Sequence, residues 1–348
     1  MKKILFGASA LALMAGAASA AEPLKLGVAG YYNVYGVYVN QDLDTGLRSS
    51  DLKRDGEINL VGSTKLDNGM VVGAQVDLST FNAISSTNIS SGRKSHLFFS
   101  GNFGKVVVGE EYAAAYMLQV TAPAVDENFD GFNPKFILVN DGFTAPVVNG
   151  YAQNTDKSAK VSYLSPVFSG FQAGVSYTPD QAALTFAGMR ADTTEVSSID
   201  LGVKYSGVVS GSGFDVGFGY TKMDNKILGT DPSAWNIGAN VGFGAFKVGA
   251  AYLKNDADVA NADSHAYNLG LGYDMGAYTV GVSYFHGEQD TAAATEDKNT
   301  RILVGGSYTY GPGMTFKGSI QHFDLETNTA GDTDNDGWAI VLGTNVNF

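Results

Sequence analysis

One amphipathic segment recurs through this chain. "FQAGVSY" (171–177) places an apolar side chain at every second position, with polar residues or glycine between them. It returns as "FDVGFGY" at 214–220, "FKVGAAY" at 246–252 and "YTVGVSY" at 278–284, and these last three copies begin 32 residues apart. A period of two predicts β-strands with one apolar face. The spacing predicts that the repeated unit is a hairpin, which needs neighbours to complete the structure.

The same alternation continues along most of the chain, whereas the 3.6-residue stripe of an amphipathic helix is almost absent. We therefore expect sixteen strands, near 25–39, 57–66, 70–81, 94–100, 105–111, 158–165, 171–178, 199–207, 213–223, 234–243, 246–254, 266–274, 278–286, 301–309, 314–324 and 338–348.

The connections between these strands alternate between short and long. The short ones are 67–69, 101–104, 167–170, 206–211, 244–245, 275–277 and 311–313. The long ones are rich in Asp, Asn, Thr and Ser, at 40–56, 82–93, 112–157, 179–198, 224–233, 255–265, 287–300 and 325–337. Short turns at one end and long polar loops at the other are typical of an outer-membrane barrel.

A soluble β-sandwich would also show this alternation, but its strands are usually about 5–6 residues long. The strands expected here are about 9–11 residues long, which is the length that crosses a bilayer at a tilt. Here the aromatic residues stand at strand ends, as Phe171 and Tyr177 do, which is typical of two interfacial girdles. The interposed Gln172, Gly174 and Ser176 would then face water inside a pore. We predict an all-β fold: a transmembrane, antiparallel, up-and-down barrel of sixteen strands.

The ends and the composition fit an exported protein. Residues 1–20 have two lysines, an apolar run and a small-x-small cleavage site, which predicts a cleaved signal peptide and a barrel domain over 21–348. Removing Lys2 and Lys3 changes the formal charge from −13 to −15. So acidic a chain is a poor partner for nucleic acid. Cysteine is absent, which excludes disulfides and thiolate metal sites.

Three segments resemble those of a known family. "GEINLVGSTKLDNG" (56–69), "GRKSHLFFSGNFGKVVVGEEY" (92–112) and "VSYLSPVFSGFQAGVSY" (161–177) are similar, in this order, to strands of the Gram-negative general diffusion porins. The resemblance implies a homotrimeric, water-filled outer-membrane channel, without enzymatic activity, for passive diffusion of ions and small hydrophilic solutes. We expect contacts with outer-membrane lipid and lipopolysaccharide, and recognition of the C-terminal Phe348 by the barrel-assembly machinery.

In this family the third long loop folds into the barrel, and its acids face bases on the wall. The corresponding segment is 112–157, and we expect Asp126, Glu127 and Asp130 to be its constriction acids. Four residues are candidates for the pore wall. They are Arg93, which aligns with a family arginine and would point inward with Ser95; Glu57, which stands where the family has arginine; and Lys65 and Lys160. Loss of wall arginines leaves a negative lumen and predicts a preference for cations.

Other functions are weaker alternatives. A substrate-specific channel would line its lumen with aromatic side chains, but most strand aromatics here lie on the apolar face. Ser264 and His265 are adjacent and so point to opposite faces of a strand, which argues against catalysis. By alternation His96 is expected on the lipid side or at the membrane interface. An adhesin or a pure membrane anchor is a third alternative.

A calcium site is a further hypothesis. "DTDNDG" (332–337) matches the first half of a calcium loop and would place Asp332, Asp334 and Asp336 near a loosely bound Ca²⁺. The bidentate glutamate of such loops is replaced by Gly343, so the match to a calcium loop is incomplete. Apart from this loosely bound Ca²⁺, no cofactor is expected.

Overall fold

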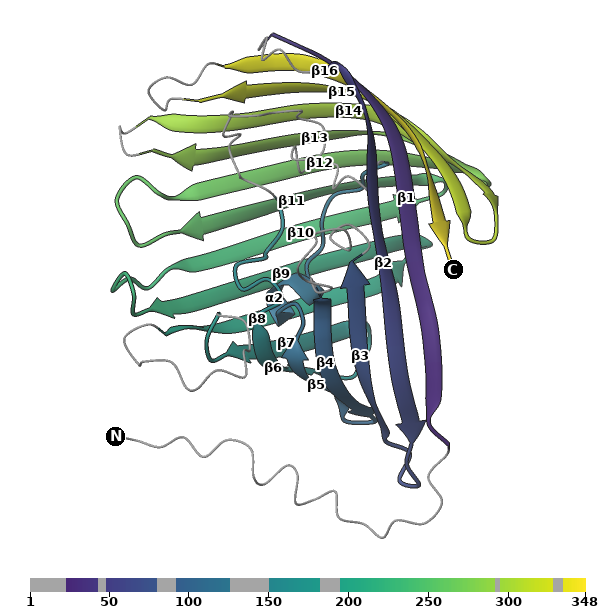
Figure 1. The fold of residues 1–348 in the computed structure, drawn as a ribbon, viewed down its shortest axis with the longest axis vertical. Helices are drawn as coiled ribbons and strands as arrows, with labels where there is room; N and C mark the ends of the chain where they lie inside the picture. The colour runs from purple at the N-terminus through teal and green to yellow at the C-terminus, as the bar shows by residue number, and fades with distance from the viewer. Residues whose placement is uncertain are drawn as a thin grey trace.

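The computed structural model describes residues 23–42, 48–79, 92–125, 150–181, 195–291, 295–327 and 334–348, without the side chains of Gly92 and Arg93. These residues form sixteen strands and one short helix (Figure 1). The strands are β1 (Lys25–Gln41), β2 (Ser50–Lys65), β3 (Val71–Ser79), β4 (Gly92–Gly101), β5 (Gly104–Glu110), β6 (Ala159–Leu164), β7 (Phe171–Thr178), β8 (Val196–Val209), β9 (Ser212–Asn225), β10 (Ser233–Phe243), β11 (Phe246–Asp256), β12 (Ser264–Met275), β13 (Tyr278–Asp290), β14 (Glu296–Gly311), β15 (Met314–Glu326) and β16 (Asn335–Asn347).

Each strand pairs antiparallel with its neighbours in sequence, and β1 pairs with β16 to close the barrel. Figure 1 shows β1 lying between β2 and the last strand, β16. At this seam Asn345 donates a side-chain hydrogen bond to Asn33. The Gly30 N–H donates to the Phe348 carbonyl at 2.8 Å, and the Phe348 N–H donates to the Gly30 carbonyl at 3.0 Å. Closure pairs the backbone groups of both terminal strands, which would otherwise be open edges.

Glycines with positive φ explain the short turns. All seven predicted turns contain one, at Gly69, Gly104, Gly170, Gly211, Gly244, Gly276 and Gly313, with φ between 58° and 106°. A side chain is disfavoured in this region, whereas glycine adopts it readily, so these turns reverse the chain within a few residues. The alternation of short turns and long connections is therefore confirmed.

The apolar face of the strands points outward. On β7, Phe171, Val175 and Tyr177 are 55%, 41% and 49% exposed, whereas Ser176 between them is 1% exposed. Near the short turns the outward aromatic rings form a contact series, Phe243 to Phe246 to Tyr273. Equivalent contacts on other strands are Phe171–Tyr205 and, toward the long loops, Trp235–Tyr252 and Tyr267–Tyr284. The two girdles flank an aliphatic band, as expected for a barrel in a bilayer.

All sixteen predicted strands are present, and several are longer than expected. β14 begins at Glu296 rather than near 301, and β8 begins at Val196 rather than near 199. These extensions lie at the long-loop ends, where polar residues continue the backbone pairing without an apolar face. In the part of the chain that the structure describes, no helix has the length and apolar character needed to span a membrane.

Candidate functional site

The third long connection enters the barrel after β5. Its described first part includes the helix α2 (Ala114–Met117) and continues as irregular chain to Val125. Ala114 and Ala115 are completely buried, and Leu118 is 3% exposed. The helix contacts β6, β7, β8 and β9 from inside the barrel (Figure 1). The segment 113–125, called the inner loop below, therefore lies against the inner wall, as predicted for this part of the connection.

A row of inward-facing glycines receives the inner loop. A side chain on Gly202 would overlap the carbonyl oxygen of Ala114, and one on Gly238 would overlap that of Val120. A side chain on any of seven inward glycines would meet the loop. At Gly202, Gly217, Gly219, Gly238 and Gly270 it would meet a backbone carbonyl oxygen, and at Gly174 and Gly281 it would meet a loop side chain. Because only a residue without a side chain lets two backbones approach so closely, these glycines form a track for the loop.

Polar side chains of the wall hold the loop backbone in this track. The Ala114 N–H donates to Ser176 Oγ at 2.9 Å, and Ser176 Oγ also lies 2.7 Å from Ser162 Oγ. Asn240 Nδ2 donates to the Thr121 carbonyl at 3.0 Å. Ser176 was expected to face pore water; the loop covers it instead. The wall thus provides hydrogen-bond partners for backbone groups of the loop at Ala114 and Thr121.

Lys160 on β6 connects the two ends of the connection. Its ammonium group donates to the carbonyl oxygens of Glu111, where the connection begins, and of Asp156 (3.0 Å) and Ser158, where it ends. The side chain points inward, as expected of a wall residue, but Lys160 is only 2% exposed. It is therefore enclosed by the chain rather than presented to an open lumen.

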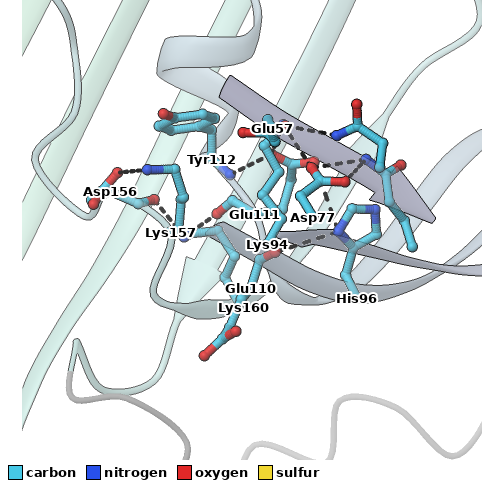
Figure 2. A network of polar contacts seen from close by, with 12 residues as sticks. Glu57, Asp77, Lys94, His96, Glu110, Glu111, Tyr112, Asp156, Lys157 and Lys160 are labelled. Carbon is cyan, nitrogen blue, oxygen red and sulfur yellow. Dashed lines mark hydrogen bonds and ion pairs between the residues drawn. The ribbon is translucent and has the colours of Figure 1, made fainter. Parts of the chain in front are cut away.

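A charged network on β3–β5 continues from this point (Figure 2). Lys94 Nζ lies 3.8 Å from Asp77 Oδ2 and 3.4 Å from Glu111 Oε1, and also faces the ring of Tyr112. Lys157 Nζ lies 4.9 Å from the centroid of the same ring. Each base in this network contacts a carboxylate, a carbonyl or an aromatic face, so its charges are largely compensated.

The wall candidates on β2 both point inward. In the sheet, Glu57 lies opposite Tyr31 on β1 and Ser79 on β3. Its Oε1 accepts a hydrogen bond from Asn59 at 2.7 Å. Lys65 has the same inward orientation at the last position of β2, next to a short turn. The two side chains therefore lie at different heights on the wall.

The expected orientations on β4 are wrong. Ser95 is exposed on the same side as Leu97, whereas His96 is 5% exposed and points inward, 3.8 Å from Glu111 Oε2. The cause is a break in register: Asp77 pairs with Lys94 but Leu78 pairs with Gly92, which leaves Arg93 as an extra residue. Such a bulge interrupts the alternation of side chains between the two faces of a strand. The face on which Ser95 and His96 lie therefore cannot be derived from the position of Arg93. Its side chain lies outside the described residues.

The predicted constriction acids and calcium ligands are described only in part. Asp126, Glu127 and Asp130 lie outside the described residues, as do residues 1–20 and Asp332. Asp334 Oδ1 accepts from the Thr327 N–H at 3.1 Å, and Asp336 Oδ2 is 3.0 Å from His322 Nε2. Within the described ranges, no three His, Cys, Asp or Glu side chains are arranged to hold a metal ion.

Ser264 and His265 do not form a catalytic pair. Ser264 Oγ accepts a hydrogen bond from Asn255 Nδ2 at 3.1 Å. The His265 ring is engaged elsewhere, with its Nε2 3.4 Å from Glu288 Oε2. Each residue thus has partners of its own, and the sequence neighbours are not brought together.

Two inward lysines, which the sequence pattern alone does not single out, lie beside the inner loop. Lys204 on β8 and Lys247 on β11 line a cavity of about 290 Å³ together with the inner loop. The repeat "FKVGAAY" (246–252) contained the signal, because Lys247 occupies the polar face of that strand. The sequence does not show that the loop and these two lysines line the same cavity.

Comparisons with known proteins agree with this architecture. A family model described as "Gram-negative porin" matches residues 7–344. An anion-selective porin from Comamonas acidovorans has a TM-score of 0.66 at 19% identity, covering 93% of this chain and 100% of that chain. OmpT of Vibrio cholerae, in its trimer form, has a TM-score of 0.65 at 13% identity, covering 94% and 100%. At these identities the likeness shows the fold.

Curated relatives come from Rickettsia and are described as uncharacterized. A Rickettsia felis protein is 27% identical over 138 residues, covering 34% of this chain and 31% of the relative. A Rickettsia conorii protein is 26% identical over 219 residues, covering 52% and 49%. The chain thus spans less than half the length of these relatives.

Proposed function

Since the chain belongs to the Gram-negative porin family, and is therefore an outer-membrane channel, we propose that it conducts ions and small hydrophilic solutes by passive diffusion and prefers cations. The observation that carries this proposal is the combination of an outward apolar band with an inward polar wall on which a loop is seated. A loop held against one side narrows a barrel without filling it, which suits diffusion of small solutes.

The preference for cations is supported by two features. The formal charge of the chain is −13. In addition, Glu57 points into the barrel at a position where related porins have a base. A carboxylate on a water-filled wall raises the local concentration of cations over that of anions. The acids Asp126, Glu127 and Asp130 are proposed to add to this effect at the constriction.

Reconstitution in planar bilayers tests both parts of the proposal. We expect stepwise conductance in KCl and, under a KCl gradient, a zero-current potential on the cation-selective side. Glu57→Gln should lower the ratio of K⁺ to Cl⁻ permeability, whereas Glu326→Gln, on the outward face of β15, should leave it unchanged. Absence of conductance would refute a diffusion channel. An anion-selective potential would refute the cation preference alone.

We also propose that the chain forms a homotrimer through the face around β1 and β2. Leu26, Val28 and Leu52 are 73%, 61% and 75% exposed there. One structural neighbour is described in a trimer form. Chemical cross-linking before denaturation should give a band at three times the chain mass, and only monomer bands would contradict the proposal. Contacts with lipopolysaccharide, and recognition of Phe348 during assembly, belong to the same proposal.

A further inference from the structure

The inner loop lines a cavity together with residues of the strands β8–β11. The cavity has a volume of about 290 Å³. Its lining consists of residues 119–124 of the loop, Tyr151, Lys204, Asp215, Asn240 and Lys247.

Lys204 and Lys247 line this cavity with the loop, from positions near the short turns. Lys204 is one inward position beyond Gly202, which contacts the loop, in the direction of the short turn after β8. Lys247 is the second residue of β11, next to the turn that follows β10. Both side chains therefore project into the same space from strands on either side of β9 and β10.

Neither lysine is neutralised within the described residues. No ion pair involves Lys204 or Lys247 in that part of the chain, and the nearby Asp215 carboxylate accepts a hydrogen bond from Ser206 Oγ at 2.7 Å. The bases on the loop side differ: Lys53 is 2.8 Å from Asp51, and Lys94 lies between two carboxylates. Uncompensated positive charge is thus concentrated on the short-turn side of the loop.

Further lysines on the short-turn side have the same orientation. The inward lysines near the short-turn end are Lys25, Lys65, Lys105, Lys204, Lys247 and Lys317. The inward acids at that level are Asp215 and Asp274. Among the described strand positions near the short turns, inward lysines therefore outnumber inward acids. A concave surface of one sign raises the local concentration of the opposite ion.

We propose that the cavity between Lys204 and Lys247 binds a small oxyanion, such as phosphate or a small carboxylate. Two ammonium groups supply point charges and hydrogen-bond donors for such a ligand. Asp215 in the lining reduces the excess positive charge and so favours anions of low charge. The inference rests on the proposed channel only for access, because the anion would enter through the lumen.

This site is compatible with an overall preference for cations. Charges in water at physiological salt are screened beyond about 8 Å. An acidic zone on the loop side and a basic zone on the turn side can therefore act separately along the pore. The basic zone would retain an oxyanion near the periplasmic end, which is where the short turns of such barrels lie.

Binding of inorganic phosphate to the folded, detergent-solubilised protein tests the proposal. Calorimetry or ³¹P NMR should detect binding by the wild type that weakens with added KCl. The double variant Lys204→Gln/Lys247→Gln should bind at least about ten-fold more weakly, because it loses both charges. The matched control, Lys222→Gln/Lys254→Gln, removes two outward lysines from β9 and β11 and should bind as the wild type does.

Heat-modifiable migration on gels confirms that each variant is folded before it is used. No binding by the wild type, or equal binding by all three proteins, would overturn the proposal. A second measurement separates this outcome from failure of the channel: phosphate should reduce KCl conductance through the wild type more than through the Lys204/Lys247 variant. Absence of any conductance would refute the diffusion channel, while the equilibrium binding result would still decide the site.

Discussion

Asn268 Oδ1 on β12 accepts a hydrogen bond of 2.9 Å from the backbone N–H of Ala122, a residue 146 positions earlier in the chain. Ala122 is 4% exposed and Asn268 is 1% exposed. The bond joins the inner loop to the wall far from the strand that the loop leaves. The inner loop is therefore attached to the wall at Ser176 on β7, Asn240 on β10 and Asn268 on β12.

Removal of this acceptor should loosen the loop. Asn268→Ala leaves the buried Ala122 N–H without its partner, a cost of about 1–3 kcal/mol. We expect larger current fluctuations in single open channels, with the barrel still folded. Asn59→Ala is the control, because Asn59 also points inward but bonds to Glu57 rather than to the loop. Equal noise in Asn268→Ala and the wild type would show that the bond does not restrain the loop.

Two glycines on β12 can test whether the loop occupies a specific position on the wall. Gly270 and Gly272 both point inward on β12, yet a side chain on Gly270 would overlap the Pro123 carbonyl oxygen, whereas the nearest atom to one on Gly272 is 4.0 Å away. Gly270→Ala should displace the loop at a cost of about 1–3 kcal/mol and change the single-channel conductance. Gly272→Ala should conduct as the wild type does. A similar conductance change in both variants would argue against a specific seat for the loop.

Lys160 should matter for stability more than for selectivity. Lys160→Met would leave the Glu111, Asp156 and Ser158 carbonyls without their donor, so we expect the free energy of unfolding to fall by about 1–3 kcal/mol. Urea titration of the folded protein in detergent measures this. Lys222→Met, which removes an exposed contact with Asp231, should change stability by less than about 1 kcal/mol. A large change in ion selectivity with unchanged stability would contradict the role assigned to Lys160.

The assignment of faces can be tested on β13. Val282 is 38% exposed on the outward face, and Thr279 points inward, where its hydroxyl donates to Asp274 at 2.8 Å. Val282→Lys places a charge against lipid and should destabilise the barrel by about 2–4 kcal/mol. Thr279→Lys should be tolerated. The yield of folded, membrane-inserted protein measures both, and the opposite ranking would mean that the faces are reversed.

Much of the architecture follows from local patterns in the sequence. The period of two marks each strand, and the turn glycines mark the short connections, so all sixteen strands were predicted. The long-loop ends were less accurate because residues such as those at 296–300 in β14 carry no apolar alternation. There, backbone pairing with β13 extends the strand, and pairing is a property of two segments rather than one.

The interior was harder to predict because it depends on register. In the sequence Gly270 does not differ from other strand glycines. Its role depends on the packing of the loop, which places Pro123 next to it. His96 was assigned to the wrong face because the extra residue at Arg93 is visible only in the pairing of β3 with β4. Lys204 and Lys247 were visible as polar-face lysines, but their shared cavity requires the loop in place.

The pairing of β1 with β16 has a consequence for the order of events in folding. Asn33 and Asn345, bonded across the seam, are separated by 312 residues. Contacts of such long range are slow to form, because the intervening chain must first lose its conformational entropy. Until the last strand arrives, β1 remains an edge able to pair with other chains. Delivery of the complete polypeptide, rather than the intrinsic speed of hairpin formation, should therefore set the rate at which sealed barrels accumulate.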